Sequence, residues 1–156
     1  MSNFNSQKII APIMRFVNLK GIIALKDGML AILPLTVVGS LFLIIGQLPF
    51  EGLNQAIASV FGDTWTEPFM QVYSGTFAIM GLISCFSIGY SYAKNSGVEP
   101  LPAGVLSLSS YFILLKSSYV PAKGEPIGDA IAKVWFGGQG IIGAIIIGLV
   151  VGAIYT

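Results

Sequence analysis

The stretch Gly137–Thr156, GGQGIIGAIIIGLVVGAIYT, carries no charge and is apolar for the length of a membrane-spanning helix. Crossing the hydrocarbon core of a bilayer takes about 20 largely apolar helical residues. Four charge-free stretches occur along the chain, at Gly28–Phe50, Pro68–Ala93, Pro100–Leu115 and Val134–Thr156. The sequence therefore predicts an all-α, polytopic integral membrane protein with about four transmembrane helices.

The composition supports a lipid environment. The chain has 156 residues, of which 54% are hydrophobic and only 10% are charged, whereas soluble domains carry about 25% charged residues. So few charges do not cover the surface of a soluble globule, and we expect the lipid bilayer to surround the apolar stretches. The net charge is +1 without a basic run, which argues against nucleic acid as a partner.

The third stretch is the shortest. A helix over residues 100–115 spans only roughly 24 Å, so it crosses a bilayer only if Lys116 reaches the interface and the helix continues through the SSYV segment at 117–120. We favour a crossing helix. The alternative is a re-entrant or buried segment.

The first 27 residues differ from the rest because apolar residues alternate with basic ones. They predict an amphipathic lead-in lying at the cytoplasmic surface of the membrane, in one or two short pieces broken near Pro12 and Gly21. Its four basic residues are Lys8, Arg15, Lys20 and Lys26.

The distribution of basic residues predicts the orientation. The connection at 51–67 has no Lys or Arg and contains Glu51, Asp63 and Glu67. Because cytoplasmic flanks are enriched in Lys and Arg, we expect a cytoplasmic N-terminus and an external 51–67 connection. The loop at 116–133 opposes this pattern with three lysines, but the first span usually dominates.

Several features inside the spans are typical of packing, although each has a functional alternative. Small residues recur every fourth position in the last span, at Gly140, Ala144, Gly148 and Gly152. Such a stripe lets another backbone approach closely, either within the same subunit, which we favour, or across a dimer seam.

Polar side chains in the spans also have two interpretations. Hydroxyls commonly bond back to their own helix, and sugar contact is the alternative for Ser74, Thr76, Ser84, Ser87, Ser91, Ser107, Ser109 and Ser110. Aromatic residues near span ends form interfacial belts, and sugar stacking is the alternative for Trp65, Tyr73, Tyr90, Tyr92, Trp135 and Tyr155.

The sequence offers no candidate catalytic, substrate-binding, cofactor-binding or metal-binding residue. Histidine is absent, and the one cysteine, Cys85, lies in the apolar run GLISCFSIGY. We expect Cys85 to be a small buried side chain, because a reactive thiolate requires a polar, electropositive environment. The Gly-rich FGGQGIIG segment at 136–143 lacks the Lys and hydroxyl residue of a phosphate-binding loop, and no cofactor is expected.

The order of these segments resembles the sugar permease subunit, enzyme IIC, of the bacterial phosphoenolpyruvate-dependent phosphotransferase system. ALKDGMLAILPLTVVGSLFLIIGQLPF resembles the first membrane helix of the cellobiose, lactose and diacetylchitobiose group. VYSGTFAIMGLISCFSIGYSYAKNSGVEPLPAGVLSLSSYFIL is similar to the second and third helices, and GGQGIIGAIIIGLVVGAIYT to the fourth.

The resemblance implies a multi-pass protein of the bacterial plasma membrane that translocates a disaccharide of the cellobiose, β-glucoside or diacetylchitobiose type for phosphorylation by a IIB subunit. It also implies IIA and IIB partners and a homodimer. In the family, the N-terminal helices form the scaffold, while the C-terminal half holds a histidine and a glutamate that contact the sugar. No position here matches either residue.

Residues 28–156 therefore correspond to the N-terminal transmembrane scaffold half of a IIC domain, without the substrate half. We expect a truncated, non-transporting fragment, since the chain stops in mid-helix at AIYT. Whether the chain counts as an enzyme is open, because it contains no phosphorylatable or catalytic residue of its own. The alternatives are a small stand-alone oligomeric membrane protein, such as a pore or assembly factor, and a membrane sensor, for which the chain has no output domain.

Overall fold

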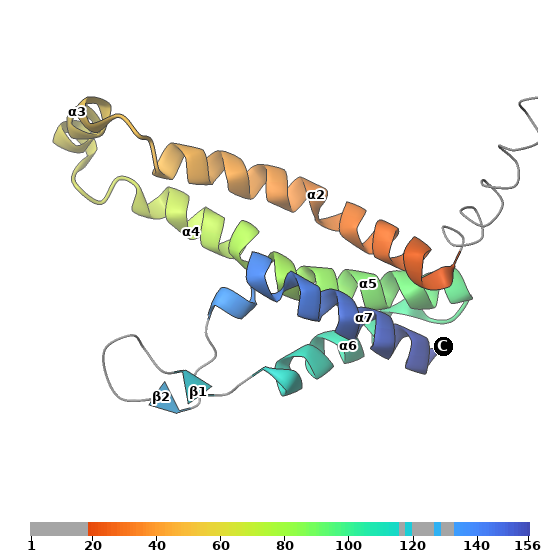
Figure 1. Ribbon diagram of the computed structural model, residues 1–156. Coiled ribbons are helices and arrows are strands. Elements are labelled where there is room, and N and C mark those ends of the chain that lie inside the picture. Colours follow the sequence, from red (N-terminus) through yellow and green to blue (C-terminus); the bar gives the residue numbers. More distant parts are fainter. Residues whose placement is uncertain (1–18, 116–117, 120–126, 129–132) are drawn as a thin grey trace, which may run out of the picture.

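The computed structural model describes residues 19–115, 118–119, 127–128 and 133–156, and these form a helical bundle with one very short hairpin (Figure 1). The predicted all-α class is confirmed. Three helical segments have the length and composition to cross a membrane: Lys20–Gly46, Glu67–Ser96 and Gly138–Tyr155. The lead-in predicted over residues 1–27 lies outside the described residues as far as residue 18.

The first spanning helix, α2 (Lys20–Gly46), begins earlier than the charge-free stretch from Gly28. It begins at Lys20, after an extended Leu19 (φ −62°, ψ 134°), so the start of the helix lies close to the break predicted near Gly21. Ala24 and Gly28 are buried, and a Cβ placed on Gly28 would lie only 2.7–2.8 Å from atoms of Ile88. The first turns of α2 therefore pack closely against α5 (Met80–Ser96).

The second predicted span is interrupted. It consists of α4 (Glu67–Gly75), a 3₁₀ turn η1 (Phe77–Ile79) and α5. Thr76 lies between them with φ −124° and ψ −85°, outside helical values. The charge-free pattern does not indicate this interruption, although the whole segment Glu67–Ser96 is long and apolar enough to cross a membrane.

A left-handed Gly97 (φ +80°) ends α5, a conformation that glycine adopts without steric cost. The next helix, α6 (Pro100–Leu114), begins with Pro at its first position. It has 15 residues and a length of roughly 22 Å, shorter than a bilayer core of about 30 Å. A fourth crossing by α6 therefore stays a prediction.

The helix does not continue through the SSYV segment. Leu115 is extended (φ −74°, ψ 139°), and β1 (Ser118–Tyr119) pairs antiparallel with β2 (Ile127–Gly128). The last stretch enters through two 3₁₀ turns, η2 (Lys133–Trp135) and η3 (Gly138–Gly140), before α7 (Ile141–Tyr155). The connection predicted at 51–67 contains an unforeseen helix, α3 (Glu51–Phe61).

Helix α5 is the centre of the bundle, because it packs against α2, α6 and α7. Figure 1 shows α2 and α4 side by side along one edge, with α6 and α7 gathered around α5 at the other end. The buried residues of α5 include Ser84, Cys85, Ile88 and Gly89. Most of the exposed surface of α2 is aliphatic, in contrast.

The small-residue stripe of the last span faces α5 within the same chain. Ala144, Gly148 and Gly152 are buried. A Cβ on Gly148 would lie 2.9 Å from the Cys85 carbonyl oxygen, and one on Gly152 would lie 2.7 Å from Cβ of Tyr92. The interpretation as a contact within the subunit is confirmed, and the stripe forms no dimer seam.

Adding a single methyl group tests this contact. We expect Gly148→Ala to lower the free energy of unfolding in detergent by about 1–3 kcal/mol relative to Gly143→Ala, because the new Cβ has no room beside the α5 backbone. A Cβ on Gly143 meets only Tyr111, at an ordinary 3.8 Å. Unfolding is measured by the reaction of the buried Cys85 thiol with a maleimide across a denaturant series. Equal stability of the two variants would contradict the packing described here.

Candidate functional site: two helix breaks and a polar pocket

Most span hydroxyls with a described hydrogen bond donate it to their own helix. Ser84 Oγ donates to the Met80 carbonyl at 2.6 Å, Ser107 Oγ to Ala103 at 2.8 Å and Thr76 Oγ1 to Val72 at 2.7 Å. The predicted back-bonding is confirmed for these three residues. Ser87 and Ser91 instead line a pocket.

That pocket lies between α2 and α5, where α2 begins and α5 ends. Its volume is about 320 Å³, and it is lined by polar and aromatic side chains, including Ser87, Tyr90, Ser91 and Lys94. Asn95 Nδ2 donates to Asp27 Oδ2 at 3.2 Å, and Lys26 Nζ lies 3.3 Å from Asp27 Oδ1. The bond between Asn95 and Asp27 joins α5 to α2 across 68 residues, and it was not predicted from the sequence.

The lining of the pocket offers hydrogen-bonding side chains but no pair of carboxylates. Asp27 is the one carboxylate in its lining, so the paired carboxylates of acid–base catalysis are lacking there. A signal for the Asp27–Asn95 contact did exist in the sequence. Antiparallel first and second spans place residue 27 and residue 95 at the same membrane surface.

The first helix break, at Thr76, faces α2. A Cβ on Gly39 would lie 2.7 Å from the Thr76 hydroxyl oxygen and 2.7 Å from Cβ of Phe77. Thr76 is β-branched and follows Gly75, two residue types with low helix propensity. The Thr76 hydroxyl donates a hydrogen bond to the Val72 carbonyl. This bond competes with the backbone hydrogen bond that the same carbonyl would accept in a continuous helix.

The second break, between residues 133 and 140, is bound by α5 and α6. The Gly81 N–H donates to the Phe136 carbonyl at 2.7 Å. Tyr111 Oη donates to the Trp135 carbonyl at 2.5 Å and lies 3.2 Å from the Gly140 carbonyl. These bonds satisfy backbone groups that a non-helical segment would otherwise leave without a partner in lipid.

The two breaks meet at a hollow of about 420 Å³. Its lining comes from both breaks and comprises Tyr73, Phe77, Ala78, Val134, Gly137, Gly138 and Gln139. Tyr73 and Phe77 stack on each other, with ring centroids 5.6 Å apart. Interrupted helices line substrate cavities in many transporters, but this hollow contains only the Gln139 amide and the Tyr73 hydroxyl as polar side-chain groups.

Cys85 is fully buried, and its Sγ lies 3.2 Å from the Ser107 carbonyl. The prediction of a small buried side chain is confirmed. Among the described residues, no three His, Cys, Asp or Glu side chains gather as a metal site would require. The structure does not decide whether the aromatic residues form an interfacial belt or stack on sugar. Several of their rings, such as those of Trp65 and Tyr90, pack on neighbouring aromatic rings.

A bundle of apolar helices, interrupted where backbone groups are satisfied internally and charged only near helix ends, defines a polytopic membrane protein of the transporter type. The comparison with family models makes this specific. The family model of the phosphotransferase system EIIC matches residues 26–156. The chain therefore belongs to the EIIC family, the membrane component of the phosphotransferase system.

Curated relatives and a solved structure agree with this assignment. The lichenan permease IIC component of Bacillus subtilis is 38% identical over 138 residues, and the cellobiose-specific EIIC component of Geobacillus stearothermophilus is 35% identical over 138 residues. Each match covers 85% of this chain but 30% of the relative. The chain thus spans less than a third of the length of these relatives.

The structural neighbour is ChbC, the IIC component of the N,N'-diacetylchitobiose-specific phosphotransferase system. The TM-score is 0.86 at 30% sequence identity, and the match covers 97% of this chain and 36% of ChbC. The fold is therefore that of one part of an EIIC transporter, and the protein is a membrane protein.

Removing one hydroxyl tests how far the second break depends on α6. We expect Tyr111→Phe to lower the free energy of unfolding by about 0.5–1.5 kcal/mol, because the Trp135 carbonyl loses the hydroxyl that donates to it. Tyr155→Phe, at the end of α7, is the matched control and should change little. Heat-induced exposure of Cys85 to a thiol reagent reports the difference. Identical unfolding of both variants would show that the Tyr111 hydroxyl does not hold the break.

Proposed function

We propose that this chain is the N-terminal scaffold portion of a IIC permease, and that the whole protein translocates a disaccharide of the cellobiose, β-glucoside or diacetylchitobiose type. The similarity to ChbC over 97% of the chain carries the proposal. The curated relatives named for lichenan and cellobiose support the class of sugar. Phosphorylation is assigned to IIA and IIB partner subunits.

The side chains of the described residues indicate that the sugar site lies in another part of the permease. The described residues of this chain form a polar pocket between α2 and α5 and mainly apolar hollows elsewhere. These lack the carboxylate pairs or cation clusters that recognise several hydroxyls at once. We assign the sugar site to the portion of the relatives that this chain does not match. Residues 28–156 then supply a rigid wall of packed helices, and residues 1–27 a surface-lying lead-in.

The proposed topology has a cytoplasmic N-terminus, an external 51–67 connection and several membrane crossings. The distribution of Lys and Arg supports it. A homodimer remains part of the proposal on family grounds. The stand-alone pore has less support, because the glycine stripe that would have formed its subunit contact is occupied by α5.

A chimera tests the scaffold assignment. Residues 1–156 are expressed in cells that lack their own cellobiose permease, either alone or joined to the remaining two thirds of the lichenan permease. We expect no accumulation of labelled cellobiose with residues 1–156 alone and measurable phosphorylation-dependent accumulation with the chimera. Uptake by residues 1–156 alone would overturn the assignment of the sugar site.

Cysteine labelling tests the orientation. Gln55 is exposed on α3, whereas Cys85 is buried and unreactive in the folded chain. We expect Gln55→Cys to react with a membrane-impermeant maleimide in intact cells, and Asn95→Cys, at the opposite end of the bundle, to react only after permeabilisation. The reverse pattern would invert the proposed topology.

A further inference from the structure

Helix α3 connects two spanning segments, so it lies at the level where the chain leaves and re-enters the membrane. Helix α2 ends at Gly46 and α4 begins at Glu67, with α3 between them at residues 51–61. Figure 1 shows α3 nearly end-on at the tips of α2 and α4, while those two helices lie across the view. Its axis thus crosses theirs, as expected of a helix that lies along a membrane surface.

The helix has two contrasting faces. Apolar residues recur at helical spacing on one face, at Phe50, Leu53, Ile57, Val60 and Phe61. Glu51, Gln55 and Ser59, spaced every four residues, lie on the other. Phe61 is 75% exposed and Val60 is 74% exposed. Apart from the half-buried Ile57, the described residues leave this apolar face largely uncovered.

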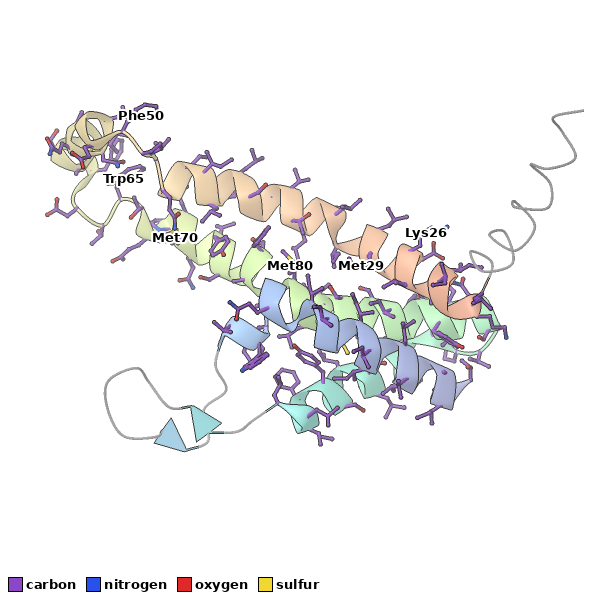
Figure 2. All side chains as sticks on the ribbon, in the orientation of Figure 1. Lys26, Met29, Phe50, Trp65, Met70 and Met80 are labelled. Carbon is purple, nitrogen blue, oxygen red and sulfur yellow. The ribbon has the colours of Figure 1, made fainter. Side chains whose placement is uncertain are left out.

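A hollow between α3 and the beginning of α4 continues this apolar face. It has a volume of about 500 Å³ and is lined by Ile57, Phe61, Thr64, Trp65, Pro68 and Phe69. Trp65 packs edge-on against Phe69, with ring centroids 6.0 Å apart. Figure 2 shows Phe50 and Trp65 at this same end of the molecule. A tryptophan beside an apolar hollow is typical of the boundary between lipid headgroups and acyl chains.

The orientation of the apolar face is held by one side-chain hydrogen bond to the preceding segment and by the backbone turn at Gly62. Asn54 Nδ2 donates to the Leu48 carbonyl at 2.8 Å, and this bond ties α3 to the end of α2. The helix ends at Gly62, whose φ of +89° turns the chain toward α4. The apolar face is thereby held in one direction relative to the spanning helices.

The charge of this segment selects the kind of lipid. Residues 47–69 contain no Lys or Arg, but include Glu51, Asp63 and Glu67. Surface helices that bind anionic lipids carry basic residues on the polar face. An acidic segment does not attract anionic headgroups, so the complementary surface is that of zwitterionic lipid.

We propose that α3 and the adjoining hollow form an interfacial lipid-binding surface, in which the apolar face of α3 enters the acyl-chain boundary of zwitterionic phospholipid. Exposed apolar side chains follow one another along the chain from the second half of α2, as at Leu41 and Ile44, to Phe50 and Leu53 at the beginning of α3. We therefore place them in the same medium as the spanning helix. The inference rests on the proposed membrane placement of α2 and α4.

Spin labels on single cysteines test the proposal in the intact chain, reconstituted in phosphatidylcholine liposomes on a C85S background. The labelled positions are Val60→Cys on the apolar face, Gln55→Cys on the polar face and Ile146→Cys on the exposed side of α7. Collision with oxygen, which dissolves in lipid, is compared with collision with a water-soluble nickel chelate. We expect the oxygen-to-nickel ratio to be several-fold higher at position 60 than at position 55.

Either of two results at position 60 would overturn the proposed lipid contact of α3. A label at position 60 that collides with nickel as often as the label at position 55 would place α3 in water. A label at position 60 that is immobilised and shielded from both reagents would mean that protein, such as a second copy, covers this face. The label at position 146 tests the membrane placement of the spanning helices independently of α3. If oxygen does not reach this label, the membrane placement itself is refuted. A stronger lipid contact at position 60 in phosphatidylglycerol liposomes would refute the preference for zwitterionic lipid.

Discussion

Close approach of backbones to α5 is the constraint on which the rest of the structure depends. In lipid, helices gain little by hiding apolar surface from one another, so association relies on van der Waals contact and on hydrogen bonds. Gly28 on α2 and Gly148 on α7 bring their backbones onto opposite sides of Ile88 and its neighbours. Gly89 allows α6 to approach at Ser107. Any side chain larger than hydrogen at these positions would separate the helices.

The same environment explains how irregular backbone is tolerated inside the bundle. Each unpaired N–H or carbonyl costs several kcal/mol in hydrocarbon, so a break in a helix requires local partners. Thr76 provides one from its own hydroxyl, and Tyr111 and Gly81 provide others for the segment before α7. Tyr111 is therefore a structural residue that holds the second break.

The charged side chains of the described residues lie near the ends of the helices, and the exposed side chains in the middle of the helices are mostly aliphatic. Asp27 and Asn95 join the beginning of α2 to the end of α5, at the surface opposite α3. Between these ends, the exposed faces are aliphatic. This arrangement agrees with the proposed scaffold role of the chain, whose match covers 36% of ChbC.

The sequence by itself determined the all-α class, the three long spans, the burial of Cys85 and the intrachain glycine contact, because apolar length and small-residue spacing are local properties. It did not reveal the break at Thr76, the helix α3 or the Asp27–Asn95 bond. A helix break requires partners for its freed backbone groups, and those partners, such as Tyr111 for residues 135 and 140, lie 24 and 29 residues away. Only the tertiary structure decided where the helices are interrupted, because only packing brings those donors to the interrupted backbone.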